Sequence, residues 1–256
     1  MGKNKLRKFE EMKGFDCVFQ YPFAALEASG GFPLRGKWHE FFGNSNPVVV
    51  ELGCGKGEYT VGLAREESRK NYIGIDIKGA RIWRGAKTAT EAGMGNVAFV
   101  RTGIELLDRF FAPGEVDEIW ITFPDPQMQK TRKRLVSARF LQLYRTVLKP
   151  GGMVHLKTDS PFLYEFASRL VRENNLPELF NSDDLYASGR KDAATAIQTF
   201  YEQQWLARGK KIKLISFRLP AEGDISDPEE DDIARDDYHS VARGVCFPEP
   251  KVNTSL

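Results

Sequence analysis

The stretch from Val48 to Gly57, Val-Val-Val-Glu-Leu-Gly-Cys-Gly-Lys-Gly, constrains the fold of this chain more than any other. Its β-branched residues and leucine predict a short strand that is buried on both faces. Glycines at 53, 55 and 57 then let the backbone turn sharply and come close to a ligand. Because the residues from Glu58 onward carry one apolar helical face, the stretch predicts a strand, a glycine turn and a helix N-terminus that together bind a nucleotide-type ligand.

Three acidic residues indicate which ligand this turn binds. A dinucleotide fingerprint, G-x-G-x-x-G, needs its third glycine at position 58, where this chain has Glu58. A pyrophosphate there would also face the like charges of Glu51 and Glu58. S-adenosylmethionine has no phosphate, and its sulfonium and amine are positive. Asp76 ends the next apolar run, where a carboxylate can accept both ribose hydroxyls, so the pattern favours S-adenosylmethionine over a turn that merely joins strand to helix.

The bulk composition is typical of one soluble α/β domain. The chain has 256 residues, of which 28% are charged and 41% hydrophobic. No apolar run approaches the ~18 residues of a membrane span, and the N-terminus lacks a signal-peptide core, so we expect no membrane association. The three cysteines lack metal-ligand spacing, which predicts no metal site and fits a reducing cytoplasm.

Apolar runs alternate with helical patterns along the chain, which predicts a parallel sheet with helices on both faces. Ligand groups then belong at the carboxyl ends of the strands, where Glu51, Asp76, Asp125 and Asp159 all fall. The predicted strands are 48–52, 72–76, 96–101, 116–123, 153–158 and 213–218, and the predicted helices are 37–42, 58 onward, 79–92, 105–110, 137–148, 162–174 and 194–207.

The charges are unevenly distributed, although the net charge is only +2. Between Asp125 and Asp159 there are eight basic residues and no acid, whereas the span from Glu222 to Asp237 holds nine acids and one arginine. This separation predicts a polyanion-binding face and an acidic, solvated tail. We therefore expect three parts: a partly flexible N-terminal arm over 1–35, one domain over 36–220, and a flexible acidic tail over 221–256.

The segment after the fourth predicted strand carries the strongest candidate for chemistry. In Phe123-Pro-Asp-Pro126 a proline follows both Phe123 and Asp125, which predicts a stiff, extended backbone that presents the Asp125 carboxylate. The basic run Lys130-Thr-Arg-Lys-Arg134 follows at once, and beside a ligand site it suits phosphate contacts, although charge runs are often only a solvated face. Asp159 can cap the next helix, contact a ligand, or do both.

These motifs together resemble the bacterial tRNA (guanine-N7)-methyltransferases, from about residue 48 to residue 218. The resemblance rests on Glu51–Gly57, Gly74-Ile-Asp-Ile-Lys78, Phe123–Pro126 with its basic run, Leu148-Lys-Pro-Gly-Gly152, Lys157-Thr-Asp159 and Thr199-Phe-Tyr-Glu202. It implies a Rossmann-like class I methyltransferase with a mostly parallel seven-stranded sheet and a late antiparallel strand. It also implies methyl transfer from S-adenosylmethionine to N7 of a guanosine in the tRNA variable loop, at position 46.

The resemblance also assigns roles to individual residues. Asp125 matches the active-site acid, and N7 carries a lone pair, so we expect Asp125 and Asp159 to accept hydrogen bonds from guanine rather than to remove a proton. We expect tRNA as partner, no obligatory protein partner, and a monomer or homodimer. Cofactor binding is assigned to Glu51, Gly53, Gly55, Gly57, Asp76 and Asp125, substrate binding to Lys130, Asp159, Thr199, Phe200, Tyr201 and Glu202, and phosphate contacts to Arg132, Lys133 and Arg134.

Three departures from the family pattern leave alternatives open. Gly103 stands where the family has an Asp near the adenine, and Gln127 replaces the Trp after Pro-Asp-Pro. The basic segment is about two residues shorter, so the substrate-contacting Lys falls on Gln129 or Lys130. The alternatives are a methyltransferase for another RNA site or a small molecule, and a tRNA-binding protein that has lost catalysis. Glu58 disfavours an NAD-dependent oxidoreductase.

Overall fold

One twisted sheet organises the molecule. The structure is a computed structural model and describes residues 3–21 and 23–236. Within these residues eight strands follow the order β1-β4-β3-β2-β5-β6-β8-β7, parallel except for β8, which is antiparallel to both β6 and β7. The strands are β1 Val18–Gln20, β2 Val48–Leu52, β3 Asn71–Ile75, β4 Val97–Arg101, β5 Val116–Thr122, β6 Leu148–Thr158, β7 Glu178–Ser182 and β8 Lys213–Arg218.

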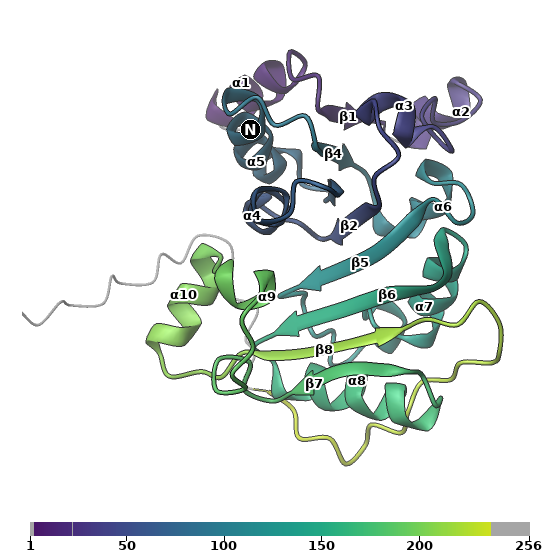
Figure 1. The fold of residues 1–256 in the computed structure, drawn as a ribbon, viewed down its shortest axis with the longest axis vertical. Helices are drawn as coiled ribbons and strands as arrows, with labels where there is room; N and C mark the ends of the chain where they lie inside the picture. The colour runs from purple at the N-terminus through teal and green to yellow at the C-terminus, as the bar shows by residue number, and fades with distance from the viewer. Residues whose placement is uncertain (1–2, 22, 237–256) are drawn as a thin grey trace, which may run out of the picture.

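Helices cover both faces of this sheet (Figure 1). Alternate residues of each central strand point to opposite sides: Val50 and Leu52 pack with residues of α3, α6, α7 and α8, whereas Val49 packs with residues of α1, α4 and α5. The helices are α1 Lys3–Met12, α2 Phe23–Ala28, α3 Trp38–Phe42, α4 Glu58–Glu66, α5 Gly79–Glu91, α6 Leu107–Phe110, α7 Ala138–Arg145, α8 Pro161–Glu173, α9 Ala193–Ala196 and α10 Phe200–Ala207. No helix in the described ranges is long and apolar enough to cross a membrane.

The predicted α/β class and the late antiparallel strand are confirmed, but the sheet has eight strands rather than seven. The sequence pattern did not reveal β1, which has three residues, or β7, whose side chains are partly exposed at the edge of the sheet. Neither strand has the continuous apolar run that marks a buried strand. The helix predicted over 194–207 is divided into α9 and α10, because Thr199 caps a new helix start.

The two terminal segments also differ from expectation. Residues 3–12, placed in a partly flexible arm, form α1, which packs on α5 and buries Met12. Residues 221–236, placed in a solvated tail, lie against the domain and bury Ile225 and Ile233 in the core cluster that contains α7 and α8 residues. The expected solvated tail therefore needs correcting for 221–236, whereas 237–256 lie outside the described residues.

Candidate active site

The four acids expected at strand ends lie along one edge of the sheet. Their strands β3, β2, β5 and β6 are consecutive neighbours and run parallel, so their carboxyl ends meet there. Glu51 lies within the last residues of β2, Asp76 follows β3, Asp125 lies three residues after β5, and Asp159 follows β6. The topology thus brings together residues that are more than 100 positions apart.

The glycine turn has the predicted form. Gly53, Gly55 and Gly57 have φ of +74°, +55° and +70°, which an L side chain rarely adopts. A Cβ on Gly57 would lie 2.6 Å from the Phe99 ring and 3.1 Å from the Cα of Gly85, so α4 and α5 approach closely here. This turn leaves backbone N–H groups at the start of α4 available for a ligand.

Asp76 and Glu51 lie on either side of this turn in different environments. Asp76 accepts hydrogen bonds from the backbone nitrogens of Gly55 (3.0 Å) and Lys78 (2.7 Å), which orient its carboxylate beside the turn. Glu51 is buried and accepts the hydroxyls of Thr60 and, at 2.6 Å, Thr122. Burial raises the pKa of Glu51 to about 7. Asp76 is therefore held beside the turn, where its carboxylate could accept the hydroxyls of a ribose, whereas Glu51 is buried and links β2 to α4 and β5.

The loop after β5 presents Asp125 to solvent but not by the predicted backbone. Phe123 has φ of +48° rather than the extended conformation expected before Pro124, and Gln127 also has φ of +48°. The Asp125 carboxylate accepts the Gln127 backbone N–H at 3.0 Å, which fixes its orientation. Non-glycine residues with positive φ cost ~1–3 kcal/mol each and persist where their surroundings determine them. This loop is therefore held in a strained conformation at the candidate site.

The basic run divides into exposed and buried members. Lys130, Arg132 and Lys133 are exposed around a short 3₁₀ turn, in positions suited to phosphates. Arg134, expected to contact phosphates as well, has a side chain that is 0% exposed and is paired with Glu230. The prediction for Arg134 is therefore wrong in this structure, because the segment 221–236 covers it.

Asp159 is the least satisfied acid of the edge. Its side chain is buried, and its Oδ2 has no hydrogen-bond partner among the residues that the structure describes. The nearest cation is the Lys210 ammonium, 4.0 Å from Oδ2. Burial raises the pKa of Asp159, because the charged form loses hydration. A buried acceptor without a partner costs about 1–3 kcal/mol, which an incoming N–H donor would recover.

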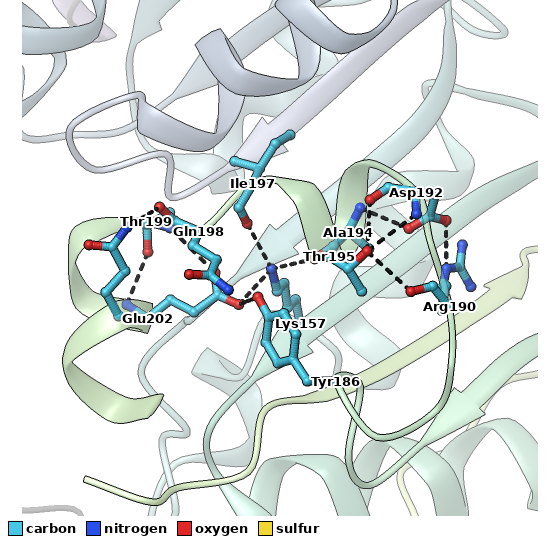
Figure 2. A network of polar contacts seen from close by, with 11 residues as sticks. Lys157, Tyr186, Arg190, Asp192, Ala194, Thr195, Ile197, Gln198, Thr199 and Glu202 are labelled. Atoms are coloured by element: carbon cyan, nitrogen blue, oxygen red, sulfur yellow. Dashed lines mark hydrogen bonds and ion pairs between the residues drawn. The ribbon is translucent and has the colours of Figure 1, made fainter. Parts of the chain in front are cut away.

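Figure 2 shows that Glu202, expected to bind substrate, belongs to an internal network around the Lys157 ammonium. Both Glu202 and Lys157 have side chains that are 0% exposed, with 2.7 Å between Oε1 and Nζ. Lys157 also donates to the carbonyls of Ala194 (2.6 Å) and Ile197 (3.1 Å), and the Tyr186 hydroxyl donates to Glu202 at 2.7 Å. Direct contact of Glu202 with substrate is therefore not available in this structure: its carboxylate pairs with Lys157 and joins α10 to β6, while the Lys157 ammonium holds Ala194 of α9.

The residues before Glu202 have separate positions. Thr199 caps α10: its hydroxyl accepts the Glu202 backbone N–H at 3.2 Å. Phe200 and Tyr201 are 50% and 48% exposed, and the Lys56 ammonium lies 4.6 Å and 5.3 Å from their ring centroids. Two open aromatic rings next to the glycine turn can stack on a base.

Sequence reasoning missed the residues that hold the site together. The two threonines that donate to Glu51, Thr60 and Thr122, had no recognisable signal, because their role depends on α4 and β5 both packing against β2. Lys157 lies in the Lys-Thr-Asp motif and Lys56 in the glycine motif, but roles were predicted only for the neighbouring residues of these motifs. For Lys56 and Lys157, the signal that could have revealed their role was that both belong to a motif at the ligand-binding edge of the sheet.

Comparison with known proteins is consistent with this site. The family model described as "Putative methyltransferase" matches residues 45–215. A Porphyromonas gingivalis tRNA (guanine-N(7)-)-methyltransferase is 59% identical over 236 residues (91% of this chain, 96% of the relative). A Bacteroides thetaiotaomicron protein of the same name is 53% identical over 244 residues (95% and 96%).

Solved structures support the fold at much lower identity. The 16S rRNA methyltransferase KamB has a TM-score of 0.55 at 13% identity, covering 72% of this chain and 93% of that one. A 30S ribosomal A1408 methyltransferase from an uncultured bacterium has a TM-score of 0.53 at 18% identity, covering 72% and 93%. The sequence relatives, with the glycine turn and the acids along one sheet edge, establish that this chain belongs to the tRNA (guanine-N7)-methyltransferase family.

Proposed function

We propose that this chain transfers the methyl group of S-adenosylmethionine to N7 of a guanosine in the tRNA variable loop, at position 46, in the cytoplasm. The observation that carries the proposal is the buried Oδ2 of Asp159, which has no hydrogen-bond partner among the described residues and lies at the same sheet edge as the glycine turn and the exposed Asp125. The name shared by the relatives supplies the reaction and the class of RNA.

The residues at the glycine turn fit S-adenosylmethionine. Gly53, Gly55 and Gly57 leave the backbone open to a ligand, the Asp76 carboxylate would accept the ribose hydroxyls, and none of these groups would repel the positive sulfonium or amine. The Glu105 carboxylate lies 3.1 Å from where a Cβ on Gly103 would be, so it can supply the acid that the family has at that position. The cofactor brings an electrophilic methyl group on sulfur.

Guanine N7 has an exposed lone pair and no proton at neutral pH. It would attack a sulfonium methyl group directly: the N–C bond would form as the C–S bond breaks, the bonding electron pair would go to sulfur, and the positive charge would pass to the guanine ring. The step needs no general base, so the residues contribute by positioning, which can supply several kcal/mol. Asp125 and Asp159 would accept hydrogen bonds from guanine N1–H and the amino group, thereby fixing N7 in line with the sulfonium.

The surroundings of these acids suit RNA rather than a small molecule. Lys130, Arg132 and Lys133 are exposed directly after Asp125, where they can contact phosphates. Phe200 and Tyr201 are exposed next to Lys56 of the glycine turn and can stack on an unpaired base. We infer that the nucleotide is recognised after local unstacking, since its N1 edge must reach a buried acceptor.

The test uses radiolabelled S-adenosylmethionine and unmodified tRNA, followed by borohydride and aniline treatment, which cleaves RNA at 7-methylguanosine. A single cleavage in the variable loop is the expected result. Label without cleavage would move the target atom elsewhere, and no label would refute the proposed reaction. Asp159→Asn should lose most activity and keep cofactor affinity, because it replaces the acceptor for guanine without altering the glycine turn.

A further inference from the structure

The acidic segment 222–236, named here the strap, is attached to the domain at several points. It follows β8 and continues around the outside of α8, drawn in yellow in Figure 1. Its Ile225 and Ile233 are buried. The Asp227 carboxylate accepts the backbone N–H of Ala138, the first residue of α7, at 2.7 Å. Two apolar anchors and a helix contact hold the strap in one path.

Through Glu230, the strap reaches the loop that carries Asp125. The buried Arg134 guanidinium donates to the carbonyls of Pro126 (3.1 Å) and Gln127 (3.2 Å), and to the Glu230 carboxylate at 2.5 Å. Pro126 and Gln127 are the two residues after Asp125, and the Gln127 N–H is the donor that orients the Asp125 carboxylate. The pair therefore fixes the peptide groups that place this acid.

Glu230 also binds Thr131, farther along the same loop, and neutralises the buried charge of Arg134. Its second carboxylate oxygen accepts the Thr131 hydroxyl at 3.1 Å. The Arg134 guanidinium stacks over the rings of Phe162 and Phe166, with 4.9 Å and 4.0 Å to their centroids, so it is shielded from water. Burial of a guanidinium requires a counter-charge, and among the described residues Glu230 provides it.

A second contact of the strap lies beside the other acid of the site. Asp236 accepts the hydroxyl of Ser160 and, at 2.9 Å, the backbone N–H of Phe162. Ser160 directly follows Asp159 and caps α8, its hydroxyl accepting the Leu163 N–H at 2.9 Å. The strap thus holds the backbone immediately after Asp159 as well as that after Asp125.

We propose that the strap is a positioning element of the guanine-binding site, with Glu230 and Asp236 as positioning residues that act through Arg134 and Ser160. This inference rests on the proposed function. Neither strap acid is expected to touch substrate. Because the strap contacts the acid-bearing loops and not the glycine turn, its loss should reduce turnover and leave the affinity for S-adenosylmethionine unchanged.

The test compares Glu230→Gln with Asp231→Asn, which removes a neighbouring exposed charge that makes no hydrogen bond or ion pair with the described residues. Glu230→Gln should lower kcat at saturating tRNA about 10- to 100-fold, the range that a small misplacement costs. Calorimetry should give the same S-adenosylmethionine Kd for both variants. Trypsin should cleave after Arg132 and Lys133 faster in Glu230→Gln, since the loop has lost its anchor.

A second variant keeps the test decisive if Glu230→Gln does not fold. Asp236→Asn leaves the Arg134 pair intact and should lower kcat with unchanged Kd and unchanged tryptic cleavage of the 130–134 loop. If each folded variant retains kcat within about twofold of Asp231→Asn, the strap does not position the acids. If wild-type protein transfers no methyl group, the proposed function fails, and the trypsin comparison, which needs no substrate, still decides whether Glu230 holds the loop.

Discussion

The buried pair of Lys157 and Glu202 permits a prediction in which burial decides the magnitude. Lys157→Met keeps an unbranched side chain of similar length in the space beside Ala194 and Ile197 but removes the ammonium. Glu202 is then left with a fully buried side chain and no counter-charge among the described residues. The Tyr186 hydroxyl is left as its nearest donor, 2.7 Å away.

The expected loss of unfolding free energy is about 3–5 kcal/mol, the usual cost of removing one member of a buried pair. For a chain of this size, 1 kcal/mol corresponds to about 2–4 °C, so Tm should fall by about 6–20 °C. The double variant Lys157→Met/Glu202→Gln should recover at least half of the loss, because no unpaired charge remains. Arg69→Met, in an exposed pair with Glu67, should leave the midpoint unchanged.

Urea unfolding followed by circular dichroism measures the four proteins, and hydrogen exchange reports on the α10 amides. If α9 and α10 detach before the domain unfolds, the loss of stability appears as faster hydrogen exchange of the α10 amides. A loss below about 1 kcal/mol with α10 amides still protected would refute the reasoning, since the carboxylate would then be satisfied without Lys157. The reasoning would also be refuted if Lys157→Met/Glu202→Gln were less stable than Lys157→Met.

Three further predictions concern the edge of the sheet. Burial raises the pKa of Glu51 from 4.5 to about 7, so the stability that the protonated Glu51 carboxyl contributes is complete below pH 4.5, and about 3 kcal/mol of it should be lost as pH rises through 7. Glu51→Gln should flatten the stability profile in urea unfolding from pH 4.5 to 8, and an unchanged slope would contradict the assignment. Arg132→Ala and Lys133→Ala should each reduce the slope of log Kd for tRNA against log salt by about one, and a slope equal to that of wild type would exclude a phosphate contact. Gly57→Ala places a Cβ 2.6 Å from the Phe99 ring in a residue with φ of +70°. Calorimetry should therefore show that the variant binds S-adenosylmethionine at least about tenfold more weakly, and an affinity equal to that of wild type would mean that the turn is not the binding site.

Local pattern was sufficient for the central part of the fold. The strands predicted at 48–52, 72–76 and 116–123 are rich in apolar residues because β2, β3 and β5 are buried on both faces, and glycines with positive φ follow the first of them. Acids at their carboxyl ends then shared one edge because parallel strands place those ends together. These features depend on residues close in sequence, which is why they could be predicted.

Tertiary contacts decided which charged residues remain available to a ligand. Arg134 and Lys133 are adjacent and equally basic in sequence, yet one is buried against Glu230, 96 positions away, and the other is exposed. Glu202 and Asp159 are both acids in ligand-edge motifs, yet Glu202 pairs with Lys157 at 2.7 Å, whereas the Asp159 Oδ2 accepts no hydrogen bond from the described residues and has Lys210 only at 4.0 Å. Whether a charge is solvated, paired or left without a partner depends on what the folded chain brings next to it, and no local pattern contains that information.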